Sequence, residues 1–231
     1  MTYLPTVKRE NLVAFYPFSE GSGSTAYDYS SDGNDGAISG AVYIKIPSGG
    51  YALDFDGSND YVTDLPVTNL QSDEEQTVSF WIKTTTSSDS TIIGDTNDSD
   101  HEWLITVNKR SSNVIEWGAE NTGNWHEYYG STTINDGEWH HIVVVFRGTG
   151  NNKAGANTVY FYVDGLKDTT NIYREETGTW TDLGSSNNIE IGRWTYQNDQ
   201  FFDGKISNVT IYNVALTAEE VKQLYKQTYI Q

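Results

Sequence analysis

The sequence predicts an all-β protein, a sandwich or barrel of antiparallel strands with one short helix near the C-terminus. Three observations lead to this expectation. Apolar and polar residues alternate with a period of two, as at 77–82, where Val78, Phe80 and Ile82 share one face. Segments rich in Gly, Asn and Ser separate these stretches. No helical pattern interrupts the strands before residue 217.

The alternation places the expected strands along the middle and late chain. They lie at 77–82, 103–107, 114–119, 139–146, 158–163, 188–192 and 205–212. The segment 142–146 is apolar on both faces, which indicates a central strand covered on both sides. Asp164-Gly165 follows the strand at 158–163 and predicts a hairpin turn there.

The helix is expected over about residues 217–227. Thr217 and Glu220 form the pattern of a capping box, in which each side chain accepts from the other residue's backbone N–H. Val221, Leu224 and Tyr225 then make an apolar stripe at helical spacing. We therefore expect the helix to pack on the outside of the strands.

Length and charge exclude several classes of protein. The 231 residues fit one domain, 1–231, with its core at about 12–213. Fourteen Lys and Arg against 32 Asp and Glu give a net charge of −18, which disfavours nucleic acid and anionic lipid as partners. The absence of cysteine excludes disulfides, thiolate zinc and iron–sulfur clusters. No apolar run of ~18 residues is present, so we expect no membrane insertion.

Eight segments, in chain order, carry a resemblance to a known family. Residues 16–23 (YPFSEGSG) match the pattern W/Y-x-F-x-E-G-x-G, and residues 28–36 (DYSSDGNDG) match D-x-S-x-x-G-N-x-G. The other segments are 53–62, 77–82, 139–143, 162–165, 189–192 and 202–217. Together they resemble the laminin-G-like, concanavalin A-like jelly rolls, in particular the pentraxin-related bacterial and viral branch. The resemblance covers about residues 12–226.

The resemblance implies a jelly-roll sandwich of the concanavalin A-like lectin/glucanase type. It implies two antiparallel sheets of six or seven strands, one of them concave, and chain ends that lie close together. The strand at 12–18 is expected to pair with or neighbour the strand at 205–213. The fold hosts lectins, adhesion modules, glycanase appendages and enzymes, so it does not decide the function.

The resemblance also implies a calcium site, because in this family an ion often ties the opening loop to the last strand. Carried over by position, its ligands are Asp28, Asn34 and Asp203. Carboxylate and carbonyl oxygens are the ligands that calcium prefers. The alternative is that these are turn residues without a metal, since Asp, Asn and Gly favour turns. A calcium ion here is expected to stabilise the fold and to take no part in catalysis.

A sugar site is expected among aromatic and polar residues of the middle and late chain. Flat rings pack on the C–H faces of sugars, while a few polar groups fix the orientation. The candidate ligand-binding residues are Trp103, Glu116, Trp117, Trp125, His126, Tyr128, Arg193 and Trp194. The alternative for Trp103 and Trp117 is a place in the core, since both alternate with apolar neighbours. Trp81 and Trp139 are expected to be core residues.

We expect no enzyme activity. Glycanases on this fold carry E-x-D-x-x-E on a concave strand, and this string does not occur; Gly118 stands where a partner for Glu116 is needed. His140 and His141 are adjacent on an expected strand, so they point to opposite faces and do not chelate one ion.

The sequence therefore predicts a non-catalytic, lectin-like module that binds a neutral or basic glycan, since the charge of −18 repels acidic polysaccharide. The first alternative is a structural or adhesion protein of a phage, virus or cell surface, with other virion or surface proteins as partners. The second is a glycan-cleaving enzyme. Residues 1–10 show no signal peptide. Either the chain is kept in a cytosol or it leaves by another route, such as cell lysis, and of these we expect an extracellular or virion-surface location.

Overall fold

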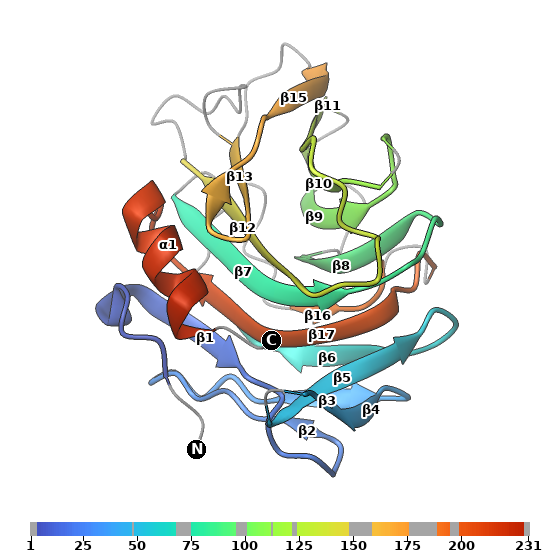
Figure 1. Cartoon of the computed structure of the whole chain (residues 1–231), viewed down its shortest axis with the longest axis vertical. Helices are drawn as coiled ribbons and strands as arrows, with labels where there is room; N and C mark the ends of the chain where they lie inside the picture. Colours follow the sequence, from blue (N-terminus) through green and yellow to red (C-terminus); the bar gives the residue numbers. More distant parts are fainter. Residues whose placement is uncertain are drawn as a thin grey trace.

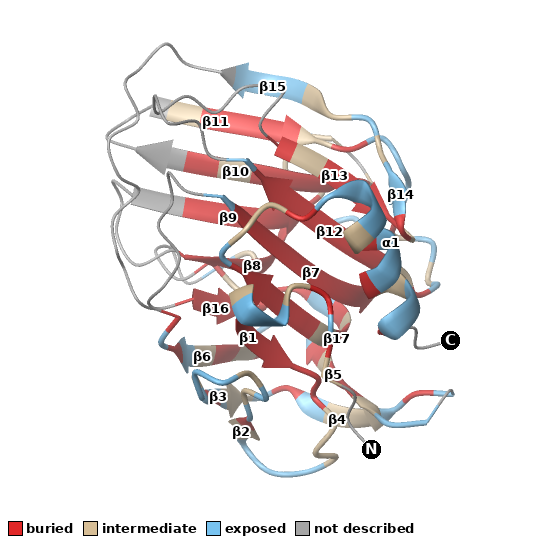
Figure 2. Cartoon of the chain, turned by 90° about the vertical axis from the view of Figure 1, so that its left-hand side faces the viewer, coloured by how far each residue is buried: buried red, intermediate tan, exposed pale blue. Residues whose placement is uncertain are grey.

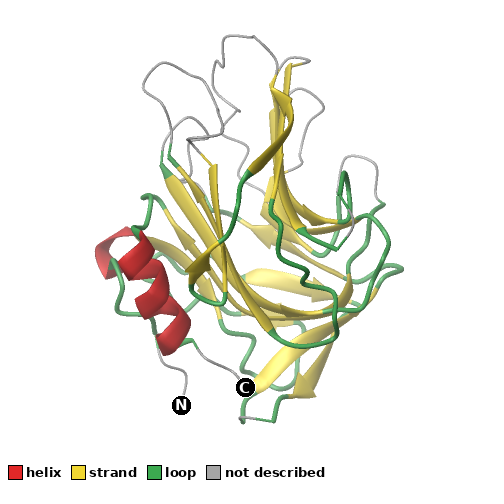
Figure 3. Cartoon of the chain, turned by 45° about the horizontal axis from the view of Figure 1, so that its top comes forward, coloured by secondary structure: helices red, strands yellow, loops and turns green. Residues whose placement is uncertain are grey.

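A computed structural model describes residues 4–47, 49–67, 75–95, 101–111, 113–121, 124–147, 159–175, 189–194 and 199–228. Two antiparallel sheets, called sheet A and sheet B below, pack face to face. The one α-helix of the described residues covers the outer face of sheet A (Figures 1 and 3). This arrangement is the antiparallel sandwich that the sequence and the resemblance predict.

Sheet A has eight strands in the described residues. In the order β14-β13-β12-β7-β17-β5-β4, with β1 also paired to β17, the strands are β14 (Leu166–Lys167), β13 (Val159–Val163), β12 (His140–Phe146), β7 (Gln76–Lys83), β17 (Asp203–Tyr212), β5 (Tyr51–Asp56), β4 (Val42–Lys45) and β1 (Leu12–Tyr16). A short 3-10 helix, η1 (Arg9–Asn11), precedes β1.

Sheet B has nine strands in the described residues. In order they are β15 (Asn171–Glu175), β11 (Asn124–Tyr129), β10 (Ile115–Asn121), β9 (His101–Val107), β8 (Ser90–Asp95), β16 (Ile189–Ile191), β6 (Tyr61–Leu65), β3 (Gly36–Ser39) and β2 (Thr25–Ala26). Both sheets exceed the six or seven strands that the resemblance implies. Part of the excess is two-residue edge strands, β2 and β14, which are too short to show an alternating pattern.

The first and last strands pair as expected. Phe15 of β1 lies opposite Thr210 of β17 in an antiparallel register. The two ends of the described chain also meet, because the Thr6 backbone N–H donates to Gln227 Oε1 at 2.9 Å and the Gln227 amide donates to Thr6 Oγ1 at 2.9 Å. The expectation of neighbouring chain ends is confirmed.

Strand β7 is buried along nearly its whole length, because it is covered on both of its faces (Figure 2). Val78, Phe80 and Ile82 point between the sheets into the main core. Trp81, on the opposite side of β7, is 1% exposed and packs against Trp139 in a smaller cluster on the outer face of sheet A. Trp81 and Trp139 are therefore buried as expected, but outside the space between the sheets.

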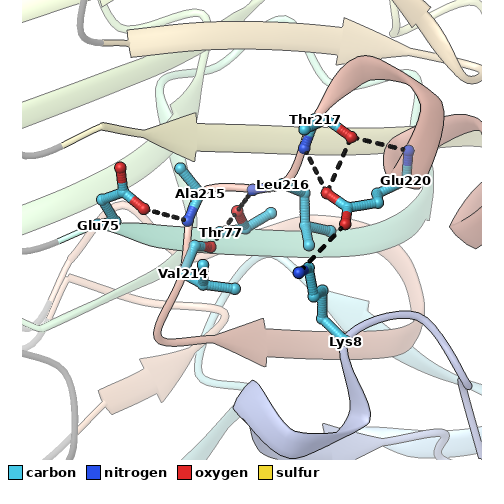
Figure 4. Close-up of polar contacts among 8 residues, drawn as sticks. All are labelled: Lys8, Glu75, Thr77, Val214, Ala215, Leu216, Thr217 and Glu220. Atoms are coloured by element: carbon cyan, nitrogen blue, oxygen red, sulfur yellow. Dashed lines mark hydrogen bonds and ion pairs between the residues drawn. The ribbon is translucent and has the colours of Figure 1, made fainter.

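The helix α1 (Ala218–Gln227) has the predicted capping box (Figure 4). Glu220 N–H donates to Thr217 Oγ1 at 3.3 Å, and Thr217 N–H donates to Glu220 Oε2 at 2.8 Å. Lys8 adds an ion pair to Glu220 at 3.6 Å. No helix in the described ranges is long and apolar enough to cross a membrane.

The turn between β17 and α1 is held by one strand of sheet A (Figure 4). The buried Thr77 hydroxyl donates to the Val214 carbonyl at 2.8 Å and accepts from the Leu216 N–H at 3.0 Å. Glu75 accepts from the Ala215 N–H at 3.3 Å. These contacts set where the helix starts relative to β7.

Candidate functional site

The Asp28 carboxylate is the centre of the opening loop. Its Oδ1 accepts from the N–H groups of Phe15 and Ser30, each at 2.8 Å. Its Oδ2 accepts from the Asn34 N–H at 2.9 Å and from the Ser30 hydroxyl at 2.7 Å. The Asn34 amide donates to the Val13 carbonyl at 3.2 Å. Four donors saturate a carboxylate, so protein groups occupy Asp28.

The predicted calcium ligands do not come together. Asp28 binds the backbone of Phe15, which lies opposite Thr210 on β17. Asp203 lies seven residues earlier on the same strand, roughly 23 Å away at ~3.3 Å per residue. The ligand set Asp28, Asn34 and Asp203 is therefore wrong. Asp28 is bound beside one end of β17, through Phe15, whereas Asp203 is the first residue at the other end. In the described part of the chain no group of three or more His, Asp or Glu side chains is placed to hold a metal. Calcium binding itself stays a prediction.

Four of the predicted ligand-binding residues lie inside the sandwich. Trp103, Trp117, His126 and Tyr128 are each at most 3% exposed. Trp117 stacks on Phe146 of sheet A, with 5.5 Å between the ring centroids. Because side chains alternate along a strand, all four point into the space between the sheets. The prediction that they contact a ligand is corrected, and they are core residues.

Glu116 points to the opposite, outer face of sheet B but serves a structural purpose. Its carboxylate accepts from the Arg110 N–H, at 2.8 Å to each oxygen, and from the Ser111 N–H at 2.7 Å. Burial raises the pKa of Glu116, against the effect of these backbone donors. Glu116 thus holds the loop after β9 across the sheet, and at 3% exposure it offers almost no surface to a ligand. Its predicted role in ligand binding is corrected.

The same loop presents Arg110 to a carboxylate and a ring. Arg110 Nε and Nη2 both lie 2.9 Å from Glu127 Oε1. The Arg110 guanidinium also lies 5.1 Å from the ring centroid of Tyr173, which is 55% exposed on β15. Tyr173 therefore has one ring face against Arg110, and much of the rest is open to solvent.

Lys109 brings two of the predicted tryptophans together. Its Nζ lies 4.5 Å from the Trp194 ring centroid and 5.7 Å from the Trp125 ring centroid. Trp194, 8% exposed, follows β16 and pairs with Asp199 through backbone hydrogen bonds. Trp125, on β11, is partly exposed and points to the outer face of sheet B.

Arg193 lies on the same outer face of sheet B, near β16 and β6. Its Nε and Nη2 donate to the two carboxylate oxygens of Glu190, at 2.6 and 2.8 Å. Its guanidinium lies 3.5 Å from the ring centroid of Tyr61. Thr63 donates to Glu190 at 2.6 Å. The pKa of Arg193 is raised, chiefly by the hydrogen bonds to Glu190, so its charge is secure.

These contacts form one feature, the aromatic–cation strip, made of Tyr61, Lys109, Arg110, Trp125, Tyr173, Arg193 and Trp194. The strip runs from β6 to β15, six strand spacings apart, which is roughly 29 Å at ~4.8 Å per spacing. The cavity beneath Lys109 is only about 10 Å³, so a ligand can lie on the strip but not under it. Sequence reasoning named Arg193 but missed the other two cations, although Lys109-Arg110 is a basic pair in a strongly acidic chain.

The antiparallel sandwich defines a lectin-like jelly roll. The family model described as the concanavalin A-like lectin/glucanases superfamily matches residues 56–222, and the chain belongs to this superfamily. A search of curated proteins finds no match.

Solved structures share the fold. Domain 4 of AbnA, an extracellular arabinanase from Geobacillus stearothermophilus solved with arabinotriose, is 22% identical with a TM-score of 0.66, and the match covers 93% of this chain and 98% of that domain. The binding domain of paraclostridial mosquitocidal protein 1 is 15% identical with a TM-score of 0.69 over 94% of this chain. The receptor-binding domain of botulinum neurotoxin type G is 17% identical with a TM-score of 0.64 over 94%. The chain spans about half the length of these toxin domains, 52% and 51%.

Proposed function

We propose that this chain is a non-catalytic carbohydrate-binding module that holds an extended glycan along the aromatic–cation strip. The observation that carries the proposal is the row of Tyr61, Trp125 and Tyr173 on one sheet face, each ring beside a cation, with the buried Trp194 ring packed against Lys109 between them. Rings of this kind pack on sugar C–H faces, while charged groups bind hydroxyls. A row of roughly 29 Å suits an oligosaccharide better than a single sugar.

The structural neighbours support the same class of function. One was solved with arabinotriose, and others are receptor-binding domains of toxins. Both kinds of neighbour favour glycan or receptor recognition outside a cell over chemistry on a substrate. The net charge of −18 disfavours an acidic glycan and the cations of the strip disfavour a basic one, so we expect a neutral glycan there.

The state of the carboxylates favours binding without cleavage. A glycosidase needs two carboxyl groups that flank the scissile bond. Here Glu116 is occupied by backbone donors, Glu127 by Arg110 and Glu190 by Arg193. A sugar would have to displace a salt bridge or a loop before reaching either carboxylate of such a pair.

The test is a glycan array on the whole chain, followed by titration of the best hit. We expect Trp125→Ala and Tyr173→Ala each to weaken binding about five- to thirtyfold, since a stacked ring contributes on the order of 1–2 kcal/mol. Tyr27→Ala is the matched control, because Tyr27 is 49% exposed at the β2 edge of sheet B. Running the array with calcium and with chelator tests the calcium prediction at the same time.

The outcomes separate the alternatives. Binding lost in Trp125→Ala but kept in Tyr27→Ala supports the strip. Binding equal in the wild type and all three variants places the site elsewhere and overturns the proposal for the strip. Release of reducing ends from a bound glycan would instead establish an enzyme.

Exposed apolar side chains at the sheet edges support a second candidate function, a structural or adhesion role. Leu166 on β14 is 71% exposed and Ile172 on β15 is 45% exposed, and both strands lie at sheet edges. Exposed apolar residues on edge strands favour protein contacts. A blank array, together with self-association or capture of a surface protein that Leu166→Lys abolishes, would favour this second function.

A further inference from the structure

A second concave site lies on sheet A, away from the strip. A pocket of about 410 Å³ opens on the outer face of sheet A, among the β4–β5 hairpin, β7, β17 and the segment before β12. This volume lies in the range of small-molecule sites. Its lining consists of Ile44, Lys45, Ile46, Pro47, Lys83, Glu138, Trp139 and Lys205.

The pocket wall contains two like charges side by side. Lys83 of β7 and Lys205 of β17 are directly opposite in the antiparallel register. Side chains opposite each other in such a pair start ~5 Å apart at Cβ, and like charges there destabilise the sheet. A bound anion between the two ammonium groups would remove this repulsion.

The local charge contrasts with that of the whole chain. Three of the 14 basic residues, Lys45, Lys83 and Lys205, line this one pocket. Lys205 has an ion pair with Asp54 at 3.1 Å, whereas among the described residues neither Lys45 nor Lys83 has an ion-pair partner. The exposed Glu138 is the one acidic residue in the lining. Charges farther away than ~8 Å are largely screened at physiological salt, so the local balance of three lysines against Asp54 and Glu138 decides the charge of the pocket.

The floor of the pocket is apolar and held in place. Trp139 and Ile46, each 7% exposed, pack in the outer cluster with Trp81. The Gly137 N–H donates to the Thr84 carbonyl at 3.0 Å, which ties the segment before Trp139 to the end of β7. Such a floor accepts the apolar face of a sugar ring without first rearranging.

We propose that this pocket binds an anionic sugar residue. Its carboxylate or sulfate group lies between Lys83 and Lys205, Lys45 closes the side, and the sugar ring rests over Trp139 and Ile46. The saccharide part of this inference rests on the proposed function, whereas the anionic part rests on the pocket's own charges. The chain then recognises a neutral stretch of glycan on sheet B and an acidic unit on sheet A.

The test compares sugars that differ only in the anionic group. Calorimetric titrations of the whole chain use glucuronate against glucose, and galactose 6-sulfate against galactose. The same titrations use Lys83→Gln, with Lys222→Gln as control because Lys222 is exposed on α1. Trp125→Ala is included because it disables the strip and leaves this pocket intact.

We expect glucuronate or galactose 6-sulfate, but neither neutral sugar, to bind the wild type. The affinity should fall about tenfold in Lys83→Gln, stay unchanged in Lys222→Gln and Trp125→Ala, and weaken as salt rises. Equal binding of glucose and glucuronate, or full affinity in Lys83→Gln, would overturn the proposal. Loss of acidic-sugar binding in Trp125→Ala would also overturn it, by assigning that sugar to the strip. Binding of inorganic sulfate as tight as that of galactose 6-sulfate would refute the saccharide part.

Discussion

The Asp28 carboxylate accepts the backbone N–H of Phe15 at 2.8 Å, and this bond closes the opening loop onto strand β1. Asp28 is the acceptor for three further donors of its own loop. We therefore expect Asp28→Ala to lower the free energy of unfolding by about 2–3 kcal/mol, because several donors lose their partner.

The control for this prediction is Asp32→Ala in the same loop. Asp32 is exposed, and we expect a change within ~0.5 kcal/mol. Urea unfolding followed by tryptophan fluorescence, with calcium and with chelator, measures both variants. If the loss in Asp28→Ala appeared only in calcium, Asp28 would be a metal ligand and the hydrogen-bond account would fail.

The two adjacent histidines predict a maximum of stability near pH 6.5. His141 is fully buried, and burial lowers its pKa to about 3. The unfolded chain therefore binds a proton that the folded chain does not, and stability falls below pH 6.5 by up to about 1.4 kcal/mol per pH unit. His140 lies 2.9 Å from Asp164 and 3.2 Å from Asp136, and the bond to Asp164 chiefly raises its pKa. Its contribution is complete below pH 6.5 and is lost as pH rises through its folded pKa.

Unfolding free energies between pH 5 and 8 measure this profile. We expect His141→Gln to reduce the decline from pH 6.5 to 5, and His140→Gln to reduce the decline above pH 6.5. The carboxylates of Asp136 and Asp164 have lowered pKa values, and their protonation takes effect mainly below ~pH 5. An unchanged acidic slope in His141→Gln would show that another group is responsible.

Two glycines in sheet B differ sharply in the room around them. A Cβ on Gly94 would lie only 2.4 Å from the Trp103 carbonyl oxygen, whereas a Cβ on Gly118 would meet Glu127 Cγ at 3.5 Å, an ordinary contact. We expect Gly94→Ala to destabilise by ~3 kcal/mol and Gly118→Ala to be neutral or to stabilise by ~0.5 kcal/mol. Thermal unfolding compares the two. Equal effects would refute the close approach of β8 and β9 at Gly94.

The Thr77 hydroxyl should be essential to the turn before the helix. Thr77→Val keeps the shape but leaves the Val214 carbonyl and the Leu216 N–H without their partner, so we expect a loss of about 2–3 kcal/mol. Thr77→Ser keeps the hydroxyl and should lose only ~1 kcal/mol for the methyl group. Urea unfolding distinguishes them, and a Val variant as stable as the Ser variant would contradict this account.

Local patterns predicted seven strands of the middle and late chain and the start of the helix, but not strands such as β8, β11 and β15. The alternation at 77–82 predicts β7, and the spacing of Thr217 and Glu220 predicts the capping box, because each depends on residues close in the chain. The antiparallel sandwich followed from many such segments in a family-like order. The order of the motifs did not place the candidate calcium ligands correctly. Motif order carries no information on how far apart Asp28 and Asp203 lie along β17.

Alternation determines which side chains share a face but not which face is covered. Trp117 and Trp125 are both tryptophans of sheet B, yet Trp117 points between the sheets and Trp125 points out toward Lys109. Lys83 and Lys205 are far apart in the sequence and meet only through the register of β7 and β17. The sequence by itself determined several strands and the helix start, because these depend on short-range periodicity, and its eight ordered motifs indicated the superfamily by resemblance. Only the tertiary structure decided the strip and the pocket, because both arise where separate strands pair across a sheet.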